Sequence, residues 1–99
     1  MQLIQILLPI PHVDGASALY RQINNELTER FGGVTAFSRT PAEGLWEDKS
    51  GKRERDDIIL IEVMAETFDR GWWSIYREHL ERRLKQDRIV VRVQEIALI

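Results

Sequence analysis

The pattern of hydrophobic residues along the chain changes between a period of two and a period of three to four. Residues 2–8 and 58–65 are apolar on both sides of an extended chain, which is typical of central strands. From Leu19 to Phe31 and from Trp72 to Leu84, apolar residues repeat at helical spacing. With further β-rich stretches at 34–39 and 89–99, the pattern predicts the order strand, helix, strand, strand, helix, strand.

Proline, glycine and capping residues mark the ends of these elements. Pro9 and Pro11 are expected to end the first strand after residue 8, and Gly32-Gly33 is expected to stop the first helix in a left-handed turn. Both helices are preceded by side chains whose oxygens can accept from the first free N–H groups. The candidate caps are Asp14 or Ser17 for the first helix and Thr67 or Asp69 for the second, and the second helix is expected to end near residues 86–87.

This order of elements is that of the split βαβ, or ferredoxin-like, fold. Right-handed crossovers place both helices on one face of a four-stranded antiparallel sheet. The first and third strands are central in this topology, and residues 2–8 and 58–65 are the two most apolar strands. We therefore predict an α+β fold of ferredoxin-like βαββαβ type, with residues 1–99 in a single domain.

A charged segment separates the second strand from the third. Nine of the eleven residues from Glu47 to Asp57 are charged, four positively and five negatively. Such a run is typical of a solvated hairpin tip, and a docking site for a partner is the alternative. The preceding residues 45–47 are expected to extend the sheet as a hairpin arm.

The second face of the predicted sheet is apolar, although two helices can cover only one face. A large exposed apolar patch usually marks an interface or a ligand groove. We therefore expect a sheet-to-sheet homodimer that buries about 800 Å² per partner, with edge-to-edge pairing of the C-terminal strand as the alternative. The apolar residues expected on or beside this face are Leu3, Leu7, Ile58, Leu60, Met64, Val90, Ile96 and Leu98.

Polar residues interrupt this face at the centres of its strands: Gln5, Glu62, and Arg92 or Gln94. A carboxylate between two sheets must be paired, bound to a ligand or neutralised. One interpretation is an ion pair between Glu62 and Arg92, supported by Gln5, that fixes the register of the interface. The other makes Gln5, Glu62 and Arg92 the polar anchors of a small-molecule pocket, with Glu62 as a general base.

Tryptophans and histidines supply the remaining candidates. Trp72 and Trp73 are about 100° apart around a helix, so one is expected inside and the other at a boundary. Packing is the simplest role of the tryptophans; the alternative is an aromatic wall for a flat ligand, with Trp46 and Trp72 as ligand-binding candidates. His12 is either a candidate catalytic residue or a surface turn residue. His79 is the only other histidine, so no metal site is expected.

Composition excludes several classes of function. The chain has 43% hydrophobic and 30% charged residues, a net charge of −2 and no cysteine, which excludes disulfides and thiolate chemistry. The net charge and the lack of aromatic residues in the third strand argue against nucleic-acid binding. No glycine cluster matches a phosphate or dinucleotide motif, so no cofactor is expected. Without a signal peptide or a run of about 18 apolar residues, we expect a cytoplasmic protein that does not contact membranes.

Three runs of residues carry a resemblance to known proteins: 29–36 (ERFGGVTA), 41–46 (PAEGLW) and 69–73 (DRGWW). Together they resemble a family of short bacterial proteins of about this length that has no assigned activity. The topology and apolar second face are more distantly similar to the dimeric α/β barrel group. The family resemblance carries over no catalytic residues. From the apolar second face we expect a homodimer, as in dimeric α/β barrels, that binds a small apolar or aromatic ligand; the alternative is a cofactor-independent monooxygenase or isomerase of the barrel type with Glu62, His12 and Arg92 around one cavity.

Overall fold

Five strands and two helices form the part of the chain that the computed structural model describes, residues 1–10, 15–33, 35–37, 43–47 and 53–99. All strand pairs are antiparallel; the order is β2-β4-β1-β5, and β3 pairs with β4 outside this path. The predicted α+β class with an antiparallel sheet and two helices is confirmed. The elements are β1 (Gln2–Ile10), α1 (Ala16–Phe31), β2 (Thr35–Phe37), β3 (Glu43–Glu47), β4 (Arg53–Ala65), α2 (Arg70–Arg83) and β5 (Val90–Glu95).

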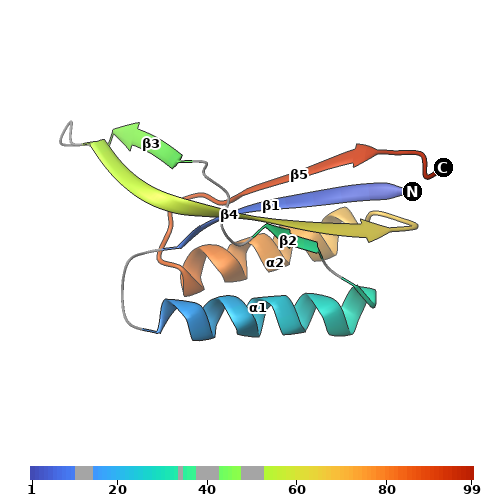
Figure 1. Ribbon diagram of the computed structural model, residues 1–99, viewed down its shortest axis with the longest axis horizontal. Coiled ribbons are helices and arrows are strands. Elements are labelled where there is room, and N and C mark those ends of the chain that lie inside the picture. The colour runs from blue at the N-terminus through green and yellow to red at the C-terminus, as the bar shows by residue number, and fades with distance from the viewer. Residues whose placement is uncertain (11–14, 34, 38–42, 48–52) are drawn as a thin grey trace.

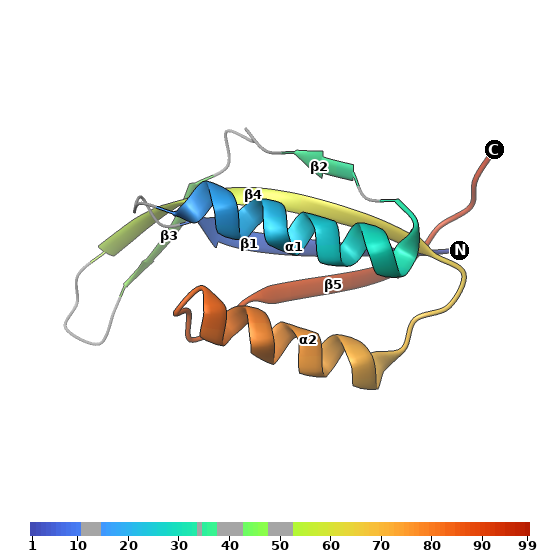
Figure 2. The same cartoon turned by 90° about the horizontal axis from the view of Figure 1, so that it is seen from below.

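The helices and the sheet form two layers, with both helices on the same side of the sheet (Figures 1 and 2). The central strands β1 and β4 pair over nine residues, from Gln2 opposite Ala65 to Ile10 opposite Asp57. β4 then continues past this pairing and joins β3, so the two strands extend beyond the helices as an arm (Figure 1). Neither of the two helices in the described part of the chain covers the other face of the sheet.

Strand β1 is longer than the prolines predict, because it continues through Pro9 to Ile10. The expected end after residue 8 is therefore wrong. β5 pairs only with Gln2–Leu7, so one side of β1 has no partner strand at Pro9. A residue without an N–H is tolerated in a strand where one edge is free.

The helix ends follow the expected chemistry at two of four positions. Gly32 closes α1 in the left-handed region with φ 79°, and Asp69 caps α2 by accepting from the backbone N–H of Trp72 at 3.1 Å. The N-cap of α1 is Gly15, with φ 88° and no side-chain hydrogen bond, and Ser17 lies inside the helix. α2 ends at Arg83, before the expected 86–87. Within the described ranges, no helix is long and apolar enough to cross a membrane.

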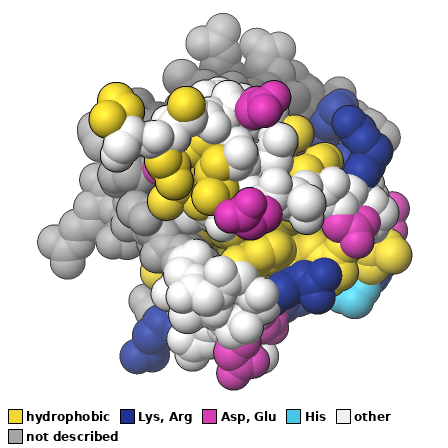
Figure 3. Space-filling view, turned by 90° about the vertical axis from the view of Figure 1, so that its right-hand side faces the viewer, with side chains coloured by type: hydrophobic (Ala, Val, Ile, Leu, Met, Phe, Trp, Pro, Cys, Tyr) yellow, Lys and Arg dark blue, Asp and Glu magenta, His cyan; other side chains and the backbone are white. Residues whose placement is uncertain are grey.

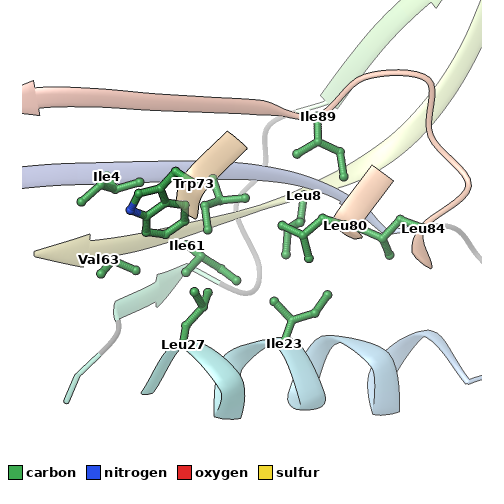
Figure 4. Packing of buried hydrophobic residues seen from close by; sticks show 11 residues of the cluster. Ile4, Leu8, Ile23, Leu27, Ile61, Val63, Trp73, Leu80, Leu84 and Ile89 are labelled. Carbon is green, nitrogen blue, oxygen red and sulfur yellow. The ribbon is translucent and has the colours of Figure 1, made fainter. Parts of the chain in front are cut away.

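The hydrophobic core fills the space between the helices and the sheet (Figure 4). On β1 and β4, every second side chain points toward the helices, as a strand with a period of two requires. The helices pack against these side chains with apolar residues that are spaced three or four positions apart in the sequence. The core residues are Ile4, Ile6 and Leu8 from β1, Ile61 and Val63 from β4, Ile23 and Leu27 from α1, Trp73, Leu80 and Leu84 in and after α2, and Ile89 before β5.

Candidate functional site on the open face

A polar row crosses the open face of the sheet, the face without helices. Gln5 on β1 lies opposite Glu62 on β4 and opposite Arg92 on β5. Directly paired residues share a face; Gln5 and Glu62 each lie between two core residues, and Arg92 follows the partly buried Val91. The row therefore has a carboxylate on one side of a central amide and a guanidinium on the other.

The carboxylate of this row is held in place by one hydrogen bond. Nε2 of Gln5 donates to Oε2 of Glu62 at 2.8 Å, and both side chains are partly buried. The hydrogen bond fixes one carboxylate oxygen, and a carboxylate offers about four acceptor positions in all. Glu62 can therefore accept further hydrogen bonds from a ligand or another chain.

An ion pair between Glu62 and Arg92 does not form within the chain. No bridge between them occurs among the described residues, and Arg92 is exposed. β1 lies between their strands, which places the two backbones about 10 Å apart. The expected ion pair is thus absent in a single copy, whereas the expected support of Glu62 by Gln5 is present.

Apolar side chains surround the polar row on this face. Leu60, Leu7 and Val90 form the next row across β4, β1 and β5, and Leu3 and Met64 lie on the other side. Met64 keeps 49% and Val90 45% of its surface exposed, whereas the core residues Ile61 and Val63 of β4 are fully buried. The prediction of an apolar second face is confirmed for these residues.

Trp72 lies in the helical layer and not beside Glu62. Its ring stacks on Tyr76 at 4.9 Å between centroids, and the guanidinium of Arg30 lies 4.2 Å above it. Trp73 is buried and stacks on Phe31 at 5.3 Å. The prediction of one inner and one boundary tryptophan is confirmed. At this end of the molecule, hydrophobic side chains reach the surface beside charged ones (Figure 3).

Of the two other candidates, Trp46 lies on the arm away from the polar row, and His12 is not among the described residues. Trp46 on β3 pairs with Glu54 on β4. Glu54 and Glu62 are eight residues apart on this strand, which corresponds to about 26 Å of extended chain. His12 lies outside the described residues, as does the whole connection between β3 and β4, residues 48–52. In the described part of the chain, no three acidic, histidine or cysteine residues are arranged to hold a metal ion.

A polar cluster between the two helices was not predicted from the sequence. The carboxylate of Glu26 accepts from Tyr76 Oη at 2.9 Å and from Arg83 Nη1 at 2.8 Å. Burial raises the pKa of Glu26, but these hydrogen bonds outweigh it and hold the pKa below its usual value. Burial, and then the hydrogen bond to Glu26, raises the pKa of Tyr76. Tyr76 and Arg83 are seven residues apart on one helix face, but nothing in the sequence identifies Glu26 as their partner.

The fold and the open face define a small α+β protein with helices on one side of an antiparallel sheet. No protein-family model matches the chain, and no curated protein matches it. A solved phage SAM lyase in complex with S-methyl-5'-thioadenosine has a similar fold, with TM-score 0.62 and 17% identity over 95% of this chain and 80% of that one. A phage SAM lyase in the apo state gives TM-score 0.55 and 14% identity over 95% and 79%. At these identities the likeness is one of fold.

Proposed function

We propose that this protein binds a small nucleoside thioether on the open face of its sheet, with Glu62 as the polar anchor. The observation that carries this proposal is the Glu62 carboxylate, held by Gln5 in the middle of a partly buried apolar face. Support comes from the fold shared with a phage SAM lyase that was solved with S-methyl-5'-thioadenosine. That molecule combines a flat base, a ribose and an apolar methylthio group.

Each part of such a ligand has a chemical partner on this face. A carboxylate accepts hydrogen bonds from ribose hydroxyls, as the acidic residue of dinucleotide sites does. Leucine side chains such as Leu7 and Leu60 suit the base and the methylthio group, because ligand sites are mostly apolar with few polar anchors. Gln5 keeps the carboxylate oriented before the ligand arrives, which lowers the entropy cost of binding.

The proposal includes a second copy of the chain over the open face. In the ferredoxin-like βαββαβ arrangement that we assign to the elements other than β3, helices protect one face only. A standard interface of about 800 Å² per partner would cover roughly a ninth of the 7128 Å² surface of the described chain. The ligand then lies between two sheets, where water is excluded.

Isothermal titration of the full-length protein with S-methyl-5'-thioadenosine tests this function. We expect saturable binding that is weakened at least about tenfold by Glu62→Gln, because a hydrogen bond to a charged group contributes about 1.5–3 kcal/mol. The matched control is Glu66→Gln, an exposed glutamate just after β4. The 2'-deoxy form of the ligand should also bind more weakly. Absence of binding, or equal binding by Glu62→Gln, contradicts the proposal.

The monooxygenase or isomerase alternative remains a prediction. It needs Glu62, His12 and Arg92 around one cavity, and His12 lies outside the described residues. The fold likeness is to proteins described as lyases. Liquid chromatography of SAM incubated with the protein is the direct test of whether the site is also catalytic.

A further inference from the structure

The polar row has opposite charges at its two ends, and this makes the open face complementary to itself. Glu62 lies on β4 and Arg92 on β5, one strand to either side of Gln5. Within the described residues Arg92 forms no ion pair in its own chain. A second sheet that faces this one therefore meets a negative charge, an amide and a positive charge in line.

We infer that a second copy docks by a two-fold axis that runs along β1 at Gln5, so that Arg92 of the partner subunit lies opposite Glu62. This rotation places β4 of one copy over β5 of the other copy. Each row of residues across the sheet then faces the same row of the partner subunit. Each Glu62 then faces a guanidinium, and the two Gln5 side chains face each other. Packed sheets lie about 10 Å apart with their strands nearly aligned, a spacing that long charged side chains can span.

The neighbouring apolar row fits the same axis. Leu60, Leu7 and Val90 cross the sheet in register. The rotation places Leu60 opposite Val90 of the partner subunit and Leu7 opposite its own copy, so this row is apolar on both sides. A two-fold axis across the strands would instead oppose Glu62 to Glu62, and like charges in an interface cost several kcal/mol.

This inference rests on the proposed function and deepens it, because the ligand site is then incomplete in one chain. The carboxylate of Glu62 has room for Gln5, for Arg92 of the partner subunit and for a ligand hydroxyl. The guanidinium adds donors and a positive charge at the site. Each dimer contains two equivalent sites, one for each Glu62.

Charge reversal in separate copies tests the pairing. We expect Glu62→Arg and Arg92→Glu each to raise the dissociation constant of self-association at least about tenfold, since like charges then face each other. An equimolar mixture of the two variants should form heterodimers, because the two basic side chains of the first variant then face the two acidic side chains of the second. Native mass spectrometry with a mass tag on one variant measures this. The control is Arg82→Glu, an exposed arginine on α2.

The outcomes separate the inference from the proposed function. Heterodimers also show that both variants fold. If the mixture pairs no better than each variant alone while the wild type self-associates, the inference is overturned and ligand binding by one chain still stands. If the reversed variants do not fold, Glu62→Gln and Arg92→Gln serve instead. Each should weaken self-association, and their combination should weaken it no further; additive effects overturn the inference.

Discussion

The two faces of the sheet are formed by alternate residues of the same strands but differ in burial and in role. On β1, Ile4, Ile6 and Leu8 are fully buried beneath the helices, whereas Leu3, Gln5 and Leu7 alternate with them and stay partly exposed. Burial of apolar surface against the helices holds the fold together. The open face repeats the apolar character but adds a polar row that the fold of a single chain does not require. Residues of the open face that contribute little to folding but lie in register across the strands are candidates for binding a ligand or another chain.

The largest expected difference between the faces comes from neighbouring residues on β1. Ile6→Ala should lower the free energy of unfolding by about 3 kcal/mol, because it leaves a cavity in the core. Leu7→Ala should cost only about 1 kcal/mol in the dissociated chain, since this side chain is already partly exposed. Urea denaturation at low protein concentration measures both.

Self-association sharpens the same comparison. Leu7 lies at the centre of the proposed interface, so Leu7→Ala should raise the dissociation constant measured by light scattering. Ile6 faces away from it, and a folded Ile6→Ala protein should associate like the wild type. Equal losses of stability in the two variants would mean that the open face is already buried within one chain.

The residues of the covered face could be predicted from the sequence, because the spacing of apolar residues within each strand or helix identifies them. A period of two in residues 2–8 and helical spacing in residues 19–31 each identify the side that must be buried. The end of β1 could not be predicted, because Pro9 is tolerated only where β5 stops pairing. That depends on a strand more than eighty residues away in the sequence.

The candidate site could be predicted in part. The sequence identifies Gln5 and Glu62 as polar interruptions of apolar strands, and the register of β1 and β4 brings them together. The sequence did not indicate that Trp72 belongs to the helical layer, because helical spacing gives the side of a helix but not what packs on it. The contact of Glu26 with Tyr76 and Arg83 joins two helices fifty residues apart, and no local pattern encodes such a pairing.

The next largest expected effect on the free energy of unfolding comes from the cluster of Glu26, Tyr76 and Arg83. Its pH dependence tests how the helical layer is stabilised. Glu26→Gln should cost about 1 kcal/mol at neutral pH, since the cluster is partly exposed to solvent. The folded-state pKa lies below the usual value of 4.5, so the stabilisation is complete above that value and is lost as the pH falls through the folded-state pKa.

The stability difference between wild type and Glu26→Gln should therefore shrink as the pH is lowered from 7 to below 4, as followed by urea denaturation. Glu29→Gln, an exposed position on the same helix, is the control. Because Glu26 lies between the helices, neither variant should change self-association. A pH-independent difference would show that the charge of Glu26 does not stabilise the fold.

The smallest expected effect lies just after α2, where Lys85 has φ 53°. The backbone N–H of Gln86 donates to the carbonyl of Glu81 at 2.9 Å, a helix end that favours glycine in the left-handed position. Lys85→Gly should raise the free energy of unfolding by about 0.5 kcal/mol, because relief of strain exceeds the added flexibility of the unfolded chain. Lys85→Ala keeps the strained Cβ and removes the charge, so it should give no gain. Both variants should self-associate like the wild type, since α2 covers the face of the sheet that the second copy does not touch; a weaker association of Lys85→Gly would mean that the helical layer takes part in the assembly.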